Sequence, residues 1–283
     1  MTGRHGVVIK SEQELRLMRE AGRINALALV TAVSVIKPGV TTADVNAAAA
    51  EVLRKHGAKP AFKDYPGPYP FPAVTTVSVN AELVHGIPGK RRLVEGDIVS
   101  IDCGSVVEGF VADSALTVGV GEISPEAQRL IDVTEQSLFE CIEKMHSGNK
   151  TGDLSAAIQD YVERHEYNVV REYTSHGVGR SMHEGPQVPN YGQSGKGMPL
   201  RSGMTIALEP MVLSGGPETR VLDDQWTVAS RDGKLTAHFE HTVAVTSNGP
   251  WVLTALENIP HLDEGNQFRY NYYFAGKVQQ ISD

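Results

Sequence analysis

The pattern of hydrophobic and polar positions divides the chain into two helix pairs, each followed by strands. Apolar residues at helical spacing follow capping signals, of which the clearest is the capping box Ser11-Glu12-Gln13-Glu14. Pro38-Gly39 is expected to stop the first helix. The predicted helices run from Ser11 to about Lys37, from Thr41 or Thr42 to Gly57, from Ser124 to about Met145 and from Thr151 to about Glu166.

Residues 98–118 predict a β-hairpin, because two apolar, β-prone runs flank Val107-Glu108-Gly109. A turn at Val107-Glu108 would place Asp102 opposite Asp113, whereas a turn at Glu108-Gly109 would make the two acids diagonal. Side chains alternate between faces, so either turn puts both carboxylates on one face, among small residues. The hairpin is therefore either part of a metal site, with a cation between the two acids, or an ordinary solvated sheet face.

Two more acids lie in otherwise apolar strands of the second half of the chain. Glu209 follows a strand predicted from Met204 to Leu208, and Glu240 lies within a strand predicted from Ala237 to Thr246. A buried carboxylate without a partner is costly, so a shared cation explains several acids in sheet centres better than chance does.

Histidines near these strands complete the candidate ligand set. The Gly-rich loop 173–189 carries His176 and His183, and His85 follows a strand predicted from Ala73 to Val79. The candidate metal ligands are Asp102, Asp113, His176, Glu209 and Glu240. Four carboxylates and one imidazole suit Mn, Fe, Co or Zn. Two ions about 3.5–4 Å apart would balance four acids better than one ion does.

Alternating prolines in residues 65–72, Tyr-Pro-Gly-Pro-Tyr-Pro-Phe-Pro, fix an extended backbone that carries aromatic rings. Such a segment is either a rigid connector or one wall of a small apolar pocket.

Composition narrows the possible classes of protein. The chain has 283 residues, of which 41% are hydrophobic and 21% charged, which is typical of a globular protein of one large or two small domains. The net charge of -8 argues against a general nucleic-acid binder. Two cysteines give no disulfide framework, and the longest apolar run, residues 26–36, is too short to span a bilayer. We therefore expect a cytoplasmic protein that binds neither DNA nor membranes.

Five segments, in this order, resemble type I methionine aminopeptidases over residues 11–256. They are HGIPG, SIDCGSVVEGFVADSALTVGVG, SHGVGRSMHEGP, ALEPMV and FEHTVAVT. The resemblance implies an α+β, pita-bread fold, in which a pseudo-twofold antiparallel sheet is covered by two helix pairs. It also implies a lead-in at residues 1–10, one catalytic domain at 11–256 and a C-terminal extension of unknown role at 257–283.

The resemblance implies two divalent metal ions per chain, which could be Co, Mn, Fe, Zn or Ni. Asp102 and Asp113 would be hairpin ligands, and Asp113 and Glu240 would bridge the two ions. His176 and Glu209 would complete the shell of one ion.

The implied activity is removal of the N-terminal methionine from nascent proteins when the second residue is small, by metal-activated attack of water on the first peptide bond. The implied catalytic residues are His85, His183 and Glu209. The implied substrate-binding residues are His85, His183, Tyr69, Phe71, Met182 and Trp226. The partners would be the N-termini of nascent polypeptides at the ribosome, and we expect a monomer.

The sequence departs from the family pattern at Met182, where an aromatic residue is more usual, and in the proline-aromatic run. Both departures concern the shape of the pocket. Two other functions are open: an Xaa-Pro peptidase, which usually resembles a longer chain with a further N-terminal domain, and a non-enzymatic binding member of the fold.

Overall fold

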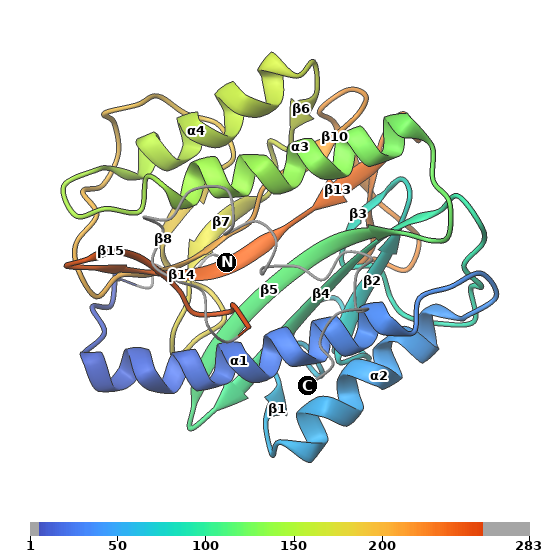
Figure 1. The fold of residues 1–283 in the computed structure, drawn as a ribbon, viewed down its shortest axis with the longest axis horizontal. Coiled ribbons are helices and arrows are strands. Elements are labelled where there is room, and N and C mark those ends of the chain that lie inside the picture. The colour runs from blue at the N-terminus through green and yellow to red at the C-terminus, as the bar shows by residue number, and fades with distance from the viewer. Residues whose placement is uncertain (1–5, 257–283) are drawn as a thin grey trace, which may run out of the picture.

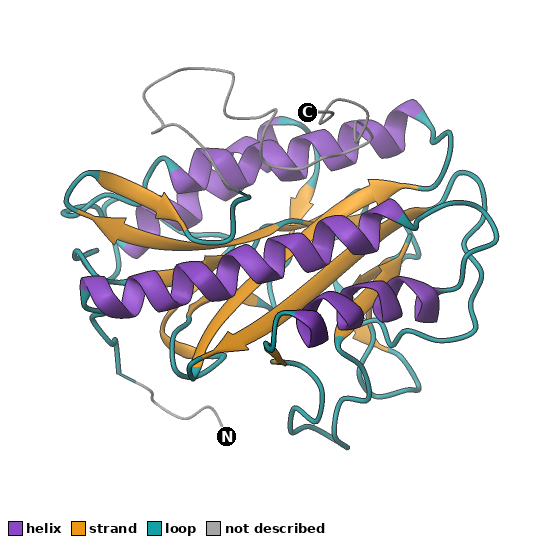
Figure 2. Cartoon of the chain, turned by 60° about the horizontal axis from the view of Figure 1, so that its bottom comes forward, coloured by secondary structure: helices purple, strands orange, loops and turns teal. Residues whose placement is uncertain are grey.

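The computed structural model describes residues 6–256 and has four long helices that cover an antiparallel sheet (Figure 1, Figure 2). The helices are α1 (Glu12–Ser34), α2 (Thr42–Lys55), α3 (Pro125–Ile142) and α4 (Thr151–Arg164). The strands are β1 (Lys59–Pro60), β2 (Thr75–Val79), β3 (Glu82–Val84), β4 (Ile98–Val107), β5 (Phe110–Gly119), β6 (Asn168–Val169), β7 (Thr174–Gly177), β8 (Glu184–Pro189), β9 (Thr205–Leu208), β10 (Met211–Leu213), β11 (Thr219–Val221), β12 (Val228–Ser230), β13 (Thr236–His238), β14 (Glu240–Thr246) and β15 (Gly249–Val252).

The predicted helix starts are confirmed, and two helix ends lie about one turn earlier than predicted. Ser11 and Thr41 both form complete capping boxes, and Ser124 caps α3. α1 ends at Ser34 and α3 at Ile142. Beyond these ends the backbone forms tighter turns, in which an N–H donates a hydrogen bond to the carbonyl three residues earlier. For example, Met145 N–H donates to the Ile142 carbonyl at 2.9 Å.

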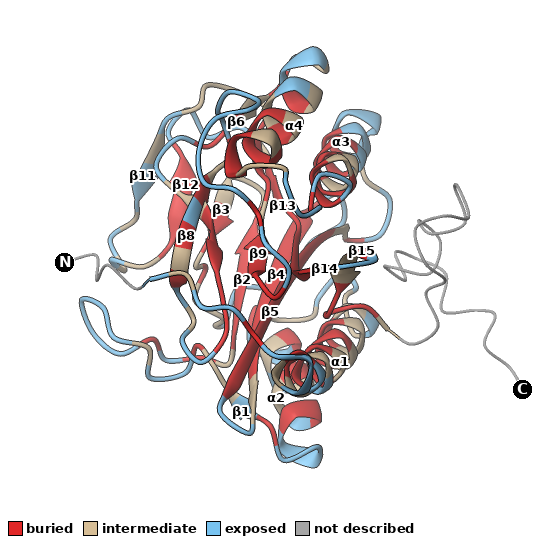
Figure 3. Ribbon diagram, turned by 90° about the vertical axis from the view of Figure 1, so that its left-hand side faces the viewer, coloured by how far each residue is buried: buried red, intermediate tan, exposed pale blue. Residues whose placement is uncertain are grey.

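The central sheet has nine strands, in the order β1-β4-β5-β14-β9-β7-β8, with β2 paired to β4 and β15 paired to β14. In Figure 1, α3 and α4 lie along one side of the strands and α1 and α2 along the other. Figure 3 shows the central strands as buried and the outer helix turns as exposed. Asn25 of α1 donates hydrogen bonds to the carbonyls of Cys103 and Ala112, which joins the first helix to the β4-β5 hairpin. The expected helix pairs over a shared antiparallel sheet are confirmed.

The hairpin takes the second of the two predicted registers. Val107 pairs with Phe110, so the turn is Glu108-Gly109, and both turn residues have positive φ. Asp102 therefore pairs with Ala115, and Asp113 pairs with Gly104. The register that placed the two acids directly opposite is wrong, and the diagonal placement on one face is right.

The strand predicted from Ala237 to Thr246 is wrong as one continuous strand. It breaks at Phe239, because β13 pairs with β10 in a separate three-stranded sheet while β14 pairs with β5 and β9. The change of partner sheet turns the chain between His238 and Glu240.

The expected C-terminal extension, residues 257–283, lies outside the described residues. Of the expected lead-in, residues 6–10 are described, and Lys10 N–H donates to the Gly203 carbonyl at 2.8 Å. Within residues 6–256, no helix is long and apolar enough to cross a membrane.

Candidate active site

One cavity of about 1090 Å³ collects the predicted acids and histidines at one part of its lining and aromatic side chains at another. We call the acid-bearing part the sheet floor and the apolar part the aromatic wall. The sheet floor consists of Asp102, Asp113, His176, Glu209 and Glu240. The aromatic wall consists of Tyr65, Phe71, Met182 and Trp226.

Strand register brings the acids of the sheet floor together. Ala115 of β5 pairs with Asp102 on one side and with Glu240 on the other, so three adjacent strands carry acids around one small side chain. Leu208 pairs with His241 on antiparallel strands, so Glu209, the next residue, lies across from Glu240. Asp102, Asp113 and Glu240 are buried, with 8%, 3% and 1% of their surface exposed.

His176 joins this floor from β7 with its Nε2 free to bind an ion. Its Nδ1 lies 2.9 Å from the Gly177 carbonyl, which can only accept, so Nδ1 carries the proton. The Nε2 atom lies 3.5 Å from Glu209 Oε1. A backbone carbonyl on the far nitrogen is a common way to orient a metal-binding imidazole.

Burial and mutual repulsion change the protonation of the whole floor. Burial raises the pKa of Asp102 to about 7. Burial, and then repulsion by neighbouring acids, raises the pKa of Asp113, Glu209 and Glu240 well above their usual range. Burial also lowers the pKa of His176 to about 3. The four acids therefore repel one another when ionised, and a cation among them would relieve that repulsion.

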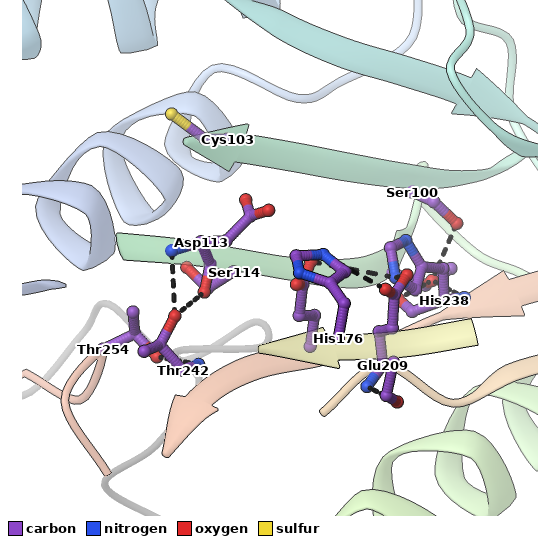
Figure 4. A network of polar contacts seen from close by, with 12 residues as sticks. Ser100, Cys103, Asp113, Ser114, His176, Glu209, His238, Thr242 and Thr254 are labelled. Carbon is purple, nitrogen blue, oxygen red and sulfur yellow. Dashed lines mark hydrogen bonds and ion pairs between the residues drawn. The ribbon is translucent and has the colours of Figure 1, made fainter. Parts of the chain in front are cut away.

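The residues of the sheet floor fit a metal. The ligand atoms of Asp113, His176 and Glu240 lie within 4.8 Å of one another, and so do those of Glu209, His238 and Glu240. Within residues 6–256, buried Asp102 Oδ1 and Asp113 Oδ1 accept no hydrogen bond. Buried carboxylate oxygens without a donor are expected where a cation binds. Cys103 lies on the opposite face of β4, in the hydrophobic core, and is not part of this set (Figure 4).

The aromatic wall is built by loops that come together. Phe71 and Trp226 meet edge to face, with ring centroids 5.2 Å apart, and the indole N–H of Trp226 donates to the Tyr69 carbonyl at 3.2 Å. A Cβ on Gly67 would lie 2.3 Å from the Trp226 ring, so glycine is required for this approach. These side chains make one part of the cavity lining apolar.

Tyr69 does not line the cavity, contrary to expectation, and Tyr65 does. The prolines carry Tyr69 to the outer side of Trp226, where its hydroxyl donates to the Asp224 carbonyl at 2.8 Å and 37% of its surface is exposed. The predicted side chains of Phe71, Met182 and Trp226 do line the cavity.

Two histidines stand between the sheet floor and the aromatic wall. His85 has a positive φ of 61°, which turns it out of the β3 strand end, and its ring lies 6.4 Å from that of Trp226. The ring centroid of His183 lies 4.3 Å from that of His176, with the rings tilted, and His183 Nδ1 lies 2.7 Å from the hydroxyl of Tyr65. Burial lowers the pKa of His85 to about 4 and also lowers the pKa of His183. Both are neutral imidazoles near neutral pH, able to donate or accept one proton.

An acid-rich floor that fits metal ions, beside an apolar wall, is consistent with a metal-dependent enzyme. The model of metallopeptidase family M24 matches residues 16–247. The chain belongs to metallopeptidase family M24.

Individual M24 proteins are similar over nearly the whole chain. It is 48% identical to the methionine aminopeptidase of Clostridium perfringens, over 89% of this chain and 100% of that protein. It is 47% identical to methionine aminopeptidase 1 of Bacillus subtilis, over 88% of this chain and 99% of that protein. The crystal structure of methionine aminopeptidase from Thermotoga maritima matches with a TM-score of 0.85 at 45% identity, over 88% of this chain and 99% of that one.

The M24 fold is also found in a prolidase from Pyrococcus horikoshii, with a TM-score of 0.72 at 24% identity. The match covers 89% of this chain and 64% of that one. These matches confirm the expected pita-bread, α+β fold.

Sequence reasoning missed two residues of this M24 site. His238 was overlooked although it lies two positions before Glu240, and alternation in the predicted strand would have put both on one face. Its Nε2 lies 3.6 Å from Glu209 Oε2. Tyr65 was overlooked because the proline-aromatic run offers three rings and no local signal says which one faces the cavity.

Proposed function

We propose that this chain is a methionine aminopeptidase that removes the N-terminal methionine from nascent polypeptides whose second residue is small, with residues 11–256 as its catalytic domain. The observation that carries the proposal is the cavity in which clustered acid and imidazole groups adjoin the aromatic wall. The similarity to methionine aminopeptidases over most of the chain supports it.

Two divalent metal ions would be held by Asp102, Asp113, His176, Glu209 and Glu240, with Asp113 and Glu240 shared between them. Carboxylates and one imidazole suit Co, Mn, Fe, Zn or Ni. When bound, such ions supply Lewis-acid polarisation and acidify water at neutral pH.

Glu209 would take the proton of the attacking water and pass it to the leaving amine. Its backbone N–H is anchored by the Ser175 hydroxyl at 2.9 Å, and its Oε1 atom faces His176.

His183 would donate to the carbonyl oxygen of the scissile bond as negative charge develops on it, and His85 would hold the scissile nitrogen. The Tyr65 hydroxyl lies within hydrogen-bond distance of His183 Nδ1, so by donating there it would leave the proton on Nε2. That tautomer is the one a donor to an oxyanion needs.

The aromatic wall would bind the methionine side chain. Phe71 is 2% exposed and packs in one apolar cluster with Met182 and Trp226, so this part of the cavity lining is apolar. An apolar pocket favours an uncharged thioether over a charged chain. The residue that follows would have to be small, because the loops bearing His85 and His183 border the same cavity.

The enzyme would act in the cytoplasm, at the ribosome, as a monomer. Its two cysteines are buried and unpaired, as in proteins of reducing compartments.

Peptide hydrolysis tests the proposal against its rivals. The full chain, loaded in turn with Co, Mn, Fe, Zn and Ni, is incubated with Met-Ala-Ser and with Ala-Pro-Ala, beside samples without enzyme. We expect methionine to be released from the first peptide only. Cleavage of Ala-Pro-Ala alone would identify an Xaa-Pro peptidase, and cleavage of neither peptide with any metal would identify a non-enzymatic member of the fold.

A further inference from the structure

His238 is a buried imidazole that faces the sheet floor and that no role above uses. Only 2% of the residue is exposed, and within residues 6–256 its Nε2 forms no hydrogen bond. That atom lies 3.6 Å from Glu209 Oε2 and 3.9 Å from Glu240 Oε2 (Figure 4). Both distances exceed the range of about 2.7–3.2 Å for an N–H···O hydrogen bond. The imidazole is therefore aimed at two carboxylates without bonding to either.

The backbone of His238 is held as firmly as that of the candidate ligand Asp113. The Thr117 hydroxyl accepts from His238 N–H at 2.9 Å and donates to the His238 carbonyl at 2.8 Å. In the same way the Thr242 hydroxyl accepts from Asp113 N–H at 2.9 Å and donates to the Asp113 carbonyl at 2.8 Å. In both cases a threonine of a neighbouring strand fixes both backbone groups of the residue, which orients its side chain toward the sheet floor.

Glu209 stands between two imidazoles. Its Oε1 atom is 3.5 Å from His176 Nε2, and its Oε2 atom is 3.6 Å from His238 Nε2. Metal–ligand bonds of about 2.0–2.2 Å put two ligand atoms of a tetrahedral ion about 3.4 Å apart. Both spacings are close to that value, and Glu240 takes part in both clusters of ligand atoms.

We propose that His238 is a sixth protein ligand of the metal centre, binding a divalent ion through Nε2 together with Glu209 and Glu240. This inference rests on the proposed metal centre and extends it by one nitrogen. A second imidazole makes the ligand set softer, so it favours Zn, Co, Fe or Ni over Mn or Mg. The alternative is that His238 only orients Glu209 through a hydrogen bond from Nε2–H.

Counting the imidazoles on the metal separates these two roles without any measurement of activity. The full chain is stripped with a chelator, labelled with nitrogen-15 histidine and loaded with Co. Co(II) is paramagnetic, so the protons of an imidazole bound to it are shifted far outside the normal proton NMR range. We expect shifted signals from two histidines in the wild type and from one in His238→Gln. X-ray absorption of the Zn-loaded proteins should show the same loss of one imidazole in His238→Gln.

His241→Gln is the matched control, because His241 is equally buried and its Nδ1 lies 2.7 Å from the Thr254 hydroxyl. It should keep both shifted histidines. A wild-type spectrum with one shifted histidine that survives in His238→Gln would overturn the proposal, even if metal affinity or turnover falls in that variant. If His238→Gln does not fold, the wild-type spectrum decides, because a single shifted histidine there would overturn the proposal.

Cleavage of Met-Ala-Ser by the wild type is scored separately. The histidine count can therefore fail while the peptidase activity stands, and the peptidase activity can fail while the count stands.

Discussion

The sheet floor and the aromatic wall line the same cavity and are built in opposite ways. Strands carry the floor, and sheet hydrogen bonds and threonine hydroxyls fix its backbone. Loops carry the wall, and ring contacts hold it. The two parts meet at Gly104 of β4. A Cβ on this residue would lie 3.1 Å from the Met182 methyl group, so glycine allows Met182 of the wall to approach the strand that carries Asp102. Metal ligands must be held at fixed distances from one another, and strands provide this. An apolar pocket can adapt its shape to the bound side chain, so loops can form it.

The largest expected effect comes from the floor, where Asp113→Ala or Glu240→Ala should abolish peptide hydrolysis. Each substitution would remove a carboxylate shared between two ions. The measurement is kcat/KM for Met-Ala-Ser, with metal content determined on the same samples. Wild-type protein stripped with a chelator should lose activity and regain it when metal is added back. Full turnover by the stripped protein would contradict a metal-dependent floor.

Replacement by alanine should have different effects at His176 of the sheet floor and at His183, which lies between the floor and the wall. His183→Ala should lower kcat by about 10²–10³, the usual loss for one donor to a developing oxyanion, and keep its metal. His176→Ala should lose metal as well as activity. Metal analysis beside kcat decides between them, and loss of metal from His183→Ala would mean that ligand and donor are assigned the wrong way round.

The free energy of unfolding of the metal-free protein should depend on pH, because Asp102 of the sheet floor is buried. The pKa of Asp102 is about 7 in the folded chain and about 3.9 when unfolded, so the folded state binds more protons between these values. The free energy of unfolding contributed by this group is therefore highest below pH 4 and falls as pH rises to 7.

Metal-free Asp102→Asn should accordingly be more stable than the metal-free wild type at pH 8, by about 4 kcal/mol at most, and similar to it at pH 4. Denaturant unfolding at the two pH values measures this. With saturating metal the order at pH 8 should reverse, because the variant lacks a ligand. An equal free energy of unfolding for both metal-free proteins at pH 8 would contradict the raised pKa of buried Asp102.

Tyr65 belongs to the wall but contacts a catalytic candidate, so Tyr65→Phe should have an intermediate effect. Loss of one hydrogen bond of about 1 kcal/mol corresponds to roughly a fivefold lower kcat. The effect should disappear when His183 is already replaced by alanine, which a double-mutant cycle would show. A full additional loss in that background would mean that Tyr65 acts on the substrate and not through His183.

The smallest expected effect is in the wall itself, at Met182. A flexible thioether adapts to different side chains, so the wild type should cleave leucyl and norleucyl peptides slowly, and Met182→Phe should discriminate more strongly. A methylene or branch is worth about 1–3 kcal/mol in such pockets. The measurement is kcat/KM for Met-, norleucyl-, Leu- and Lys-Ala-Ser. An unchanged Met/Leu ratio would remove Met182 from the pocket, and equal cleavage of the lysyl peptide would contradict an apolar pocket.

Much of the fold could be predicted from the sequence, because its signals are local. Capping boxes such as Ser11 with Glu14 join groups three residues apart, so they form wherever the chain allows a helix. The shared face of Asp102 and Asp113 follows from alternation along two strands, and it holds whichever turn joins them.

Which strands become neighbours was decided only by the tertiary structure. Glu209 meets Glu240, and His238 meets both, because β14 lies between β5 and β9 while β13 turns into another sheet. Likewise Tyr65 and not Tyr69 faces the cavity, because Trp226, distant in the sequence, packs against the proline-rich segment. These contacts depend on how the whole core is filled, and no short stretch of sequence contains that information.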